Sequence, residues 1–211
     1  MNPSDQTGQE TRERFRAPSE RYRPFGTVRC SNTSYFRSQL ARDVGCLLDV
    51  DDDVLGWCCR PYGMDDLMLE RSWKGPPPDF MATYRRGQDI YISVVEEEGD
   101  PELTEIAACG RLSHQFVSRD AVRSGHRLQN AKDLLRYASY RCPLGDRMRI
   151  MAALEQEGSA TVGECMAAFR EVNPMAGLSS LILHRFVTID LDAELIAPHT
   201  VVKIFSSDRN A

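Results

Sequence analysis

The spacing of apolar residues along the chain predicts a mixed α/β protein. From Tyr35 to Val50, apolar side chains recur every three or four positions, which is the period of a helix. The segments 80–84 and 89–95 lie on either side of Arg86-Gly87 and instead fit the two strands of a hairpin, in which alternate side chains share one face. The first half of the chain is therefore expected to contain a helix followed by strands.

The same patterns place the remaining elements. Asp100-Pro101 fits a helix start, because aspartate caps a first turn and proline is tolerated in it. Further strands are expected at 54–61, 67–72 and 115–118, with helices at 100–112 and 127–140. After Pro143 the expected elements are helices at 145–156, 162–172 and 174–185 and strands at 186–190 and 195–205. Three short helices followed by a two-stranded ribbon is the order of a winged helix.

Length and composition are those of an ordinary globular protein. The chain has 211 residues, 42% of them hydrophobic and 27% charged, which allows one large or two small domains. Residues 1–27 are polar without an apolar period and are expected to form a mostly disordered arm, and residues 206–211 a short tail. The apolar runs are too short to cross a bilayer, and the N-terminus lacks a signal core. We therefore expect a cytoplasmic protein without a membrane partner.

The charge balance weighs against strong DNA binding. The net charge is −5, and neutralisation of phosphates by basic residues drives most affinity for DNA. Four arginines in the middle of the chain are nevertheless candidates for contacts with duplex DNA: Arg111, Arg119, Arg123 and Arg127. They fit a basic edge facing phosphates and a solvated helix face equally well.

The seven cysteines predict free thiols. Their number is odd, and the adjacent pair Cys58-Cys59 lacks the spacing of a zinc site. We expect buried free thiols and no structural metal site.

The segment Pro78-Asp79-Phe80 opens the predicted hairpin, and its second strand carries Ser93 and Val95. Together with the order of the elements, these residues resemble the TnsA family of transposon end-cutting endonucleases over roughly residues 30–205. The resemblance implies a restriction-endonuclease-like domain, a mixed sheet flanked by helices, at 28–140. It also implies a small winged-helix domain at 141–205.

The resemblance further implies a metal-dependent site that this chain has mostly lost. The family's helix glutamate falls at Ala41, its strand acid at Ser93 and its lysine at Val95, so only Asp79 retains its type. One carboxylate holds Mg²⁺ poorly, and we expect no catalytic residue, metal site or cofactor to be intact. Asp79 itself also fits a carboxylate that stabilises the hairpin.

An acid or a basic residue could have migrated to rebuild the site. The candidates are Glu96, Glu97, Glu105 and Arg111. In that alternative the chain is an active Mg²⁺-dependent DNA endonuclease.

The expected function follows from the lost site. We expect a catalytically degenerate TnsA-like protein that acts as a binding or regulatory subunit in transposition or another process of a bacterial mobile element. Its expected partner is a transposase or an ATPase regulator. A third hypothesis is a DNA-binding regulator that reads DNA with its winged helix. However, the predicted helix 174–185 has only Ser179 and Ser180 as polar residues near its middle, which favours protein binding.

Overall fold

The computed structural model describes residues 26–61 and 73–206. The predicted strand at 67–72, most of the predicted arm and residues 207–211 lie outside the described residues. The first half of the chain contains α2 (Gln39–Val50), β1 (Val54–Cys59), β2 (Phe80–Tyr84), β3 (Asp89–Val95), α4 (Pro101–Cys109), β4 (Ser113–Ser118), α5 (Arg119–Arg123) and α6 (Arg127–Leu135). The second half contains α7 (Leu144–Glu157), β5 (Ala160–Thr161), α8 (Val162–Ala168), α9 (Pro174–Leu183), β6 (Val187–Ile189) and β7 (Val201–Ile204).

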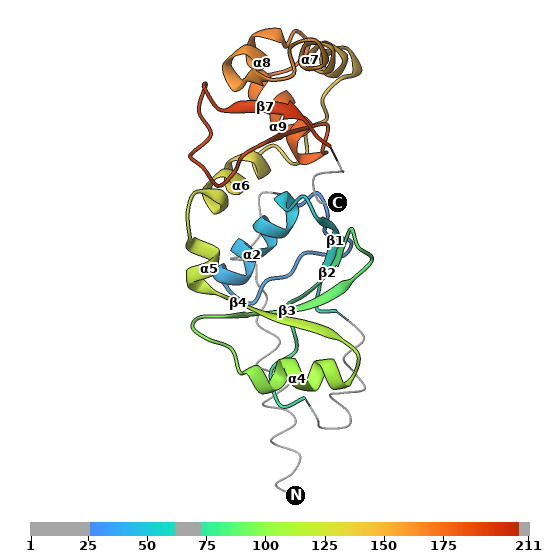
Figure 1. Cartoon of the computed structure of the whole chain (residues 1–211), viewed down its shortest axis with the longest axis vertical. Coiled ribbons are helices and arrows are strands. Elements are labelled where there is room, and N and C mark those ends of the chain that lie inside the picture. The colour runs from blue at the N-terminus through green and yellow to red at the C-terminus, as the bar shows by residue number, and fades with distance from the viewer. Residues whose placement is uncertain (1–25, 62–72, 207–211) are drawn as a thin grey trace, which may run out of the picture.

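The first half is built on a mixed sheet with the strand order β1-β2-β3-β4. The first three strands are antiparallel neighbours, whereas β3 and β4 are parallel. Helix α4 makes the crossover that a parallel pair requires, and it lies on the face of the sheet opposite to α2 (Figure 1). The predicted α/β class, with a mixed sheet flanked by helices, is confirmed.

Strand alternation divides the apolar residues between the two faces of this sheet. Phe80 is in register with Ile92, and both are buried against α2 together with Trp57. The rings of Trp57 and Phe80 meet edge to face with centroids 5.5 Å apart. On the α4 side, Tyr91 belongs to a separate buried cluster with Trp73. The two clusters fix which side chains reach each face.

The second half packs helices α7, α8 and α9 on a small antiparallel sheet of order β5-β7-β6. Helix α9 begins at Pro174 as predicted, and Asn173 caps it, with its side chain accepting a hydrogen bond from the Ala176 amide. Helix α8 starts with a capping box in which Thr161 and Glu164 satisfy each other's backbone amides. These local signals explain why the helices begin where they do.

Several predicted boundaries were wrong. Helix α2 begins at Gln39 rather than Tyr35, because Ser38 caps it by accepting from the Ala41 amide at 3.0 Å. The helices expected at 127–140 and 162–172 end at Leu135 and Ala168. In the segment expected as a strand at 195–205, only Val201–Ile204 pairs.

The loop between β6 and β7 is held by a buried side chain instead of by strand pairing. The Asn130 amide group donates to the carbonyl oxygens of Leu191 and Glu194 at 2.9 and 2.8 Å, and its oxygen accepts from the Ile196 amide at 3.0 Å. Because α6 thereby satisfies these backbone groups, the loop lies against α6 (Figure 1).

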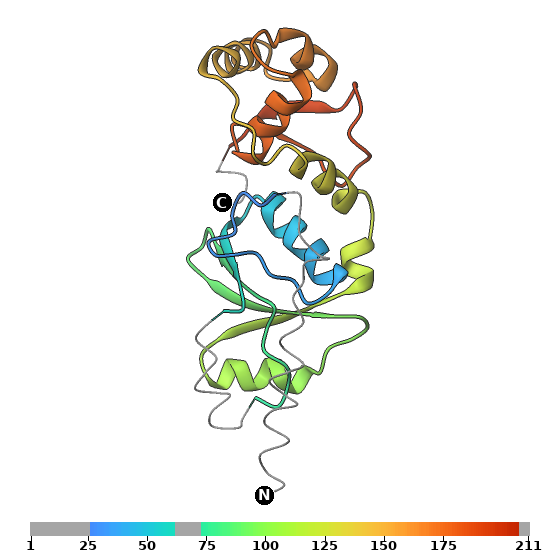
Figure 2. The same ribbon diagram turned by 180° about the vertical axis from the view of Figure 1, so that it is seen from behind.

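One hydrophobic core joins the two halves of the chain. It includes Val50 of α2 and Leu134 of α6 together with Leu178 and Leu181 of α9. Figure 2 shows α6 between the first sheet and the C-terminal helices. The apolar face of α9 is therefore used for packing between the halves.

Candidate functional site

Asp79 sits at a corner where β2 begins beside the end of β3, and its carboxylate is bound on both oxygens. Arg37, just before α2, forms a fork with Nε 2.7 Å from Oδ1 and Nη2 2.8 Å from Oδ2. The Val94 amide donates to Oδ2 at 2.7 Å, and Arg37 Nη2 also donates to the Val94 carbonyl oxygen at 2.7 Å. We call Asp79, Arg37 and Val94 the Asp79 corner.

The corner is more buried on its acidic side than on its basic side. The side chain of Asp79 is 5% exposed and that of Arg37 is 38% exposed. Burial raises the pKa of Asp79 to about 6, although Arg37 and the Val94 amide favour the charged form. The bidentate guanidinium thus supplies the counter-charge at this carboxylate.

The other three positions of the expected metal site provide no second carboxylate. Ala41, on α2, is fully buried in the cluster between that helix and the sheet, and Val95 is half-buried at the end of β3. Ser93 is buried, and its hydroxyl lies 2.9 Å from His114 Nε2. These positions serve packing and a buried hydrogen bond.

His114 and Ser93 belong to a buried polar group that the sequence did not reveal. Thr104 Oγ1 lies 3.2 Å from His114 Nδ1, so both ring nitrogens have a hydroxyl neighbour. The ring packs edge to face against Trp73 and Phe116. Burial lowers the pKa of His114 to about 4, which keeps the imidazole neutral. The sequence carries no signal for this contact, because it depends on the parallel pairing of β3 with β4.

The residues considered for a rebuilt site lie in separate elements. Glu96 forms an ion pair with Arg119 beyond the end of β3. Glu97 lies in the same exposed loop, Glu105 lies on the exposed face of α4, and Arg111 follows that helix. Within residues 26–61 and 73–206, no group of three or more histidine, cysteine, aspartate or glutamate side chains could hold a metal ion.

The four candidate arginines do not form one edge. Arg111 precedes β4, whereas Arg119 and Arg123 follow it, so the length of a six-residue strand separates them. Arg119 is paired with Glu96, and Arg127 Nη1 lies 2.6 Å from Asp192. Half of the candidate set is therefore already engaged by carboxylates.

A second polar region lies at the junction of the halves, where each half donates an arginine to the other. Arg29 Nη2 donates to the carbonyl oxygen of Leu183 at the end of α9, at 3.1 Å. Arg185 donates to the carbonyl oxygens of Asp51, at 2.7 Å, and Val54, just after α2. Cations at the carbonyl ends of helices are favoured by the helix dipole. This exchange fixes the two helix ends beside each other.

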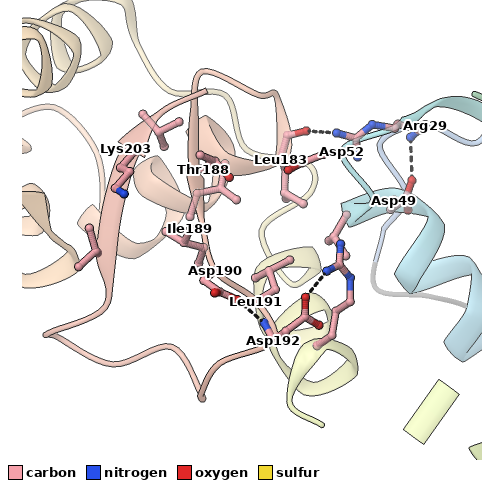
Figure 3. Close-up of a pocket in the computed structure, with 15 residues that line it drawn as sticks. Arg29, Asp49, Asp52, Leu183, Thr188, Ile189, Asp190, Leu191, Asp192 and Lys203 are labelled. Atoms are coloured by element: carbon pink, nitrogen blue, oxygen red, sulfur yellow. Dashed lines mark hydrogen bonds and ion pairs between the residues drawn. The ribbon is translucent and has the colours of Figure 1, made fainter. Parts of the chain in front are cut away.

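The junction also contains a cavity of about 420 Å³ and a deeply buried carboxylate (Figure 3). Asp49 is 0% exposed, and its Oδ1 accepts from the amides of Val28 and Arg29 at 3.2 and 2.9 Å and from Trp57 Nε1 at 3.0 Å. Its Oδ2 has no hydrogen-bond partner among the described residues. Burial raises the pKa of Asp49. No sequence motif marks this residue.

Comparisons with known proteins assign no family to the chain. No family model matches it, and no curated protein matches it. Among the helices of the described residues, none combines the length and apolar character needed to cross a membrane.

Proposed function

We propose that the chain is a catalytically degenerate, TnsA-like protein that acts as a binding or regulatory subunit in transposition or another mobile-element process. The observation that carries this proposal is the Asp79 corner. Both oxygens of its carboxylate are engaged by Arg37, and one also accepts from the Val94 amide. A bound Mg²⁺ would have to displace the guanidinium and would find no second carboxylate at Ala41 or Ser93.

The arrangement of elements supports the proposed ancestry. A helix, three antiparallel strands, a crossover helix and a parallel fourth strand follow one another in the order that a restriction-endonuclease-like domain implies. The second half has three helices and a small sheet in the order expected of a winged helix.

The C-terminal half favours protein contacts over DNA reading. In a DNA-reading version, the third helix would present polar side chains to the major groove. Here most of α9, including Ser179 and Ser180, is buried in the shared core, and Asn130 holds the β6–β7 loop against α6. We therefore propose a transposase or an ATPase regulator as the partner.

Nicking of supercoiled plasmid tests the loss of cleavage. The purified chain and its Asp79→Ala variant are incubated with Mg²⁺ or Mn²⁺, with a chelator in parallel reactions. We expect no metal-dependent nicking by either protein. Asp89→Ala serves as the matched control, because Asp89 is an exposed aspartate on the adjacent strand. Its carboxylate accepts a hydrogen bond from the Thr83 hydroxyl at 2.6 Å.

Nicking that requires metal and disappears only in Asp79→Ala would overturn the proposal and establish an active endonuclease. Nicking that survives Asp79→Ala but disappears in Glu97→Gln would instead indicate a relocated site. Cooperative unfolding of each variant shows that the proteins compared are folded. Co-purification with a candidate transposase and with a candidate ATPase regulator tests the proposed partnership, and failure with both would count against the binding role.

A further inference from the structure

Two cysteines from distant parts of the sequence meet at the edge of the first sheet. The segment around Cys30 runs beside β1, with the Ser31 amide donating to the Trp57 carbonyl oxygen at 2.8 Å. The Asn32 side chain then forms two hydrogen bonds with the backbone of Cys59, donating to its carbonyl oxygen at 2.8 Å and accepting from its amide at 3.0 Å. Cys30 Sγ lies 3.5 Å from the same Asn32 Oδ1. One amide side chain therefore holds the two cysteines together.

The two thiols differ in exposure and in acidity. Cys30 is half-exposed, whereas Cys59 is 1% exposed and its sulfur accepts from the Tyr35 amide at 3.2 Å. The proximity of the two thiols has the largest effect on both groups, lowering the pKa of Cys30 and raising that of Cys59. An accessible thiol of lowered pKa next to a second, buried thiol is the usual arrangement of a redox-reactive pair.

We infer that Cys30 and Cys59 form a peroxide-reactive pair, in which Cys30 is oxidised first and Cys59 resolves it to a disulfide. The Cys30 thiolate attacks one oxygen of a hydroperoxide, the O–O bond breaks, and the other oxygen leaves as an alcohol or water after taking a proton. Cys30 is then a sulfenic acid. The Cys59 sulfur attacks it, the S–O bond breaks, and hydroxide leaves as water with the Cys59 proton. Two thiols are oxidised, and one peroxide is reduced.

The other cysteines provide an internal comparison. Cys109 is the exposed cysteine, so accessibility alone would make it react first. Cys58 is adjacent to Cys59, but burial raises its pKa, and alternation along β1 directs the two side chains to opposite faces. Reaction at Cys30 in preference to Cys109 would thus report the pairing with Cys59.

The disulfide would tie the segment containing Arg29 to β1. Arg29 is the residue that reaches Leu183 in the second half, so the cross-link would restrain one side of the junction. It would also close a loop of about thirty residues, which stabilises a folded chain by restricting the unfolded one. We expect the oxidised protein to melt several degrees higher than the reduced protein.

Peptide mapping tests the pair in the full-length, reduced protein. The chain is treated with one equivalent of hydrogen peroxide, its remaining thiols are alkylated, and it is digested without reductant. We expect a Cys30–Cys59 linked peptide and a fall from seven to five titratable thiols in the denatured protein. Cys58→Ser and Cys109→Ser should form the same link, whereas Cys30→Ser should not.

Three outcomes would overturn the inference. In the first, Cys30 in the peroxide-treated and then denatured protein is alkylated as fully as Cys46, which would mean that Cys30 was not oxidised. In the second, the linked peptide contains Cys58 in place of Cys59. In the third, Cys30 is trapped as a sulfenic acid that never becomes a disulfide. Cys30→Ser is a conservative change at a half-exposed position, so its folding can be verified by its unfolding transition. This test does not depend on the proposed function, since it measures neither cleavage nor partner binding.

Discussion

Asp79 and Asp49 are both buried carboxylates, but they are stabilised in different ways. The side chain of Asp79 is 5% exposed and pairs with a guanidinium that reaches the surface. Asp49 is 0% exposed and relies on three N–H donors at a single oxygen. Only Asp79 lies in a segment with a recognisable pattern. A recognisable sequence pattern can therefore mark the less deeply buried of two acidic residues.

Replacement of Asp49 should have the larger effect on stability. Asp49→Ala would leave one buried and two partly buried N–H groups without an acceptor, and each group left unsatisfied in a buried position costs about 1–3 kcal/mol. We expect a loss of about 3 kcal/mol or more in the free energy of unfolding, measured with urea. Asp49→Asn keeps the accepting oxygen and should lose about 1 kcal/mol or less. Equal losses in the two variants would contradict this account of the junction.

Replacement of Asp79 should cost less, because Arg37 can return to water. We expect Asp79→Ala to lose about 1–2 kcal/mol, mainly from the unmade bond to the Val94 amide. In a double-mutant cycle with Arg37→Ala, the coupling energy should be about 1 kcal/mol. A coupling energy near zero would mean that the ion pair contributes nothing to stability, as many exposed pairs do.

The smallest effect is a pH dependence in which Asp79 and His114 oppose each other. Asp79 has a pKa raised from 3.8 to about 6, so its stabilisation is present below pH 3.8 and is lost as the pH rises through 6. His114 has a pKa lowered from 6.5 to about 4, so its stabilisation is present above pH 6.5 and is lost as the pH falls through 4. The two contributions partly cancel between pH 4 and 6.5.

Variants separate these contributions in urea midpoints measured between pH 4 and 7. Asp79→Asn removes the carboxylate, so its stability should fall more steeply on acidification than that of the parent chain. His114→Gln removes the imidazole, so its stability should fall less steeply or rise. Exposed His199, which pairs with Glu194, provides the control His199→Gln with the parental profile. Identical profiles for all four proteins would exclude both groups as the source of the pH dependence.

The sequence predicted the order of most elements, because periodicity records which side chains face a core. The hairpin with Arg86-Gly87 at its turn and the helix starts at Asp100 and Asn173 were correct for local reasons. The short elements α5 and β5 were missed, since five and two residues are too few to display a period.

The site was less accessible to prediction, because its contacts are made across the fold. That Asp79 stabilises the hairpin was one of two interpretations kept open, and its bond to the Val94 amide agrees with it. Its ion pair with Arg37 joins residues 42 positions apart, and the hydrogen bond from the Ile196 amide to Asn130 spans 66 positions. Neither partner is distinguished by local spacing. Such pairings require the tertiary structure.

The exchange of arginines at the junction limits how the protein can be divided for study. A fragment starting at residue 141 would lose the Arg29 contact with Leu183 and would uncover Leu178 and Leu181, which belong to the same buried cluster as residues of α2 and α6. Exposed apolar surface of this kind promotes aggregation. Point variants on the intact chain are therefore the appropriate means of assigning a binding role to either half.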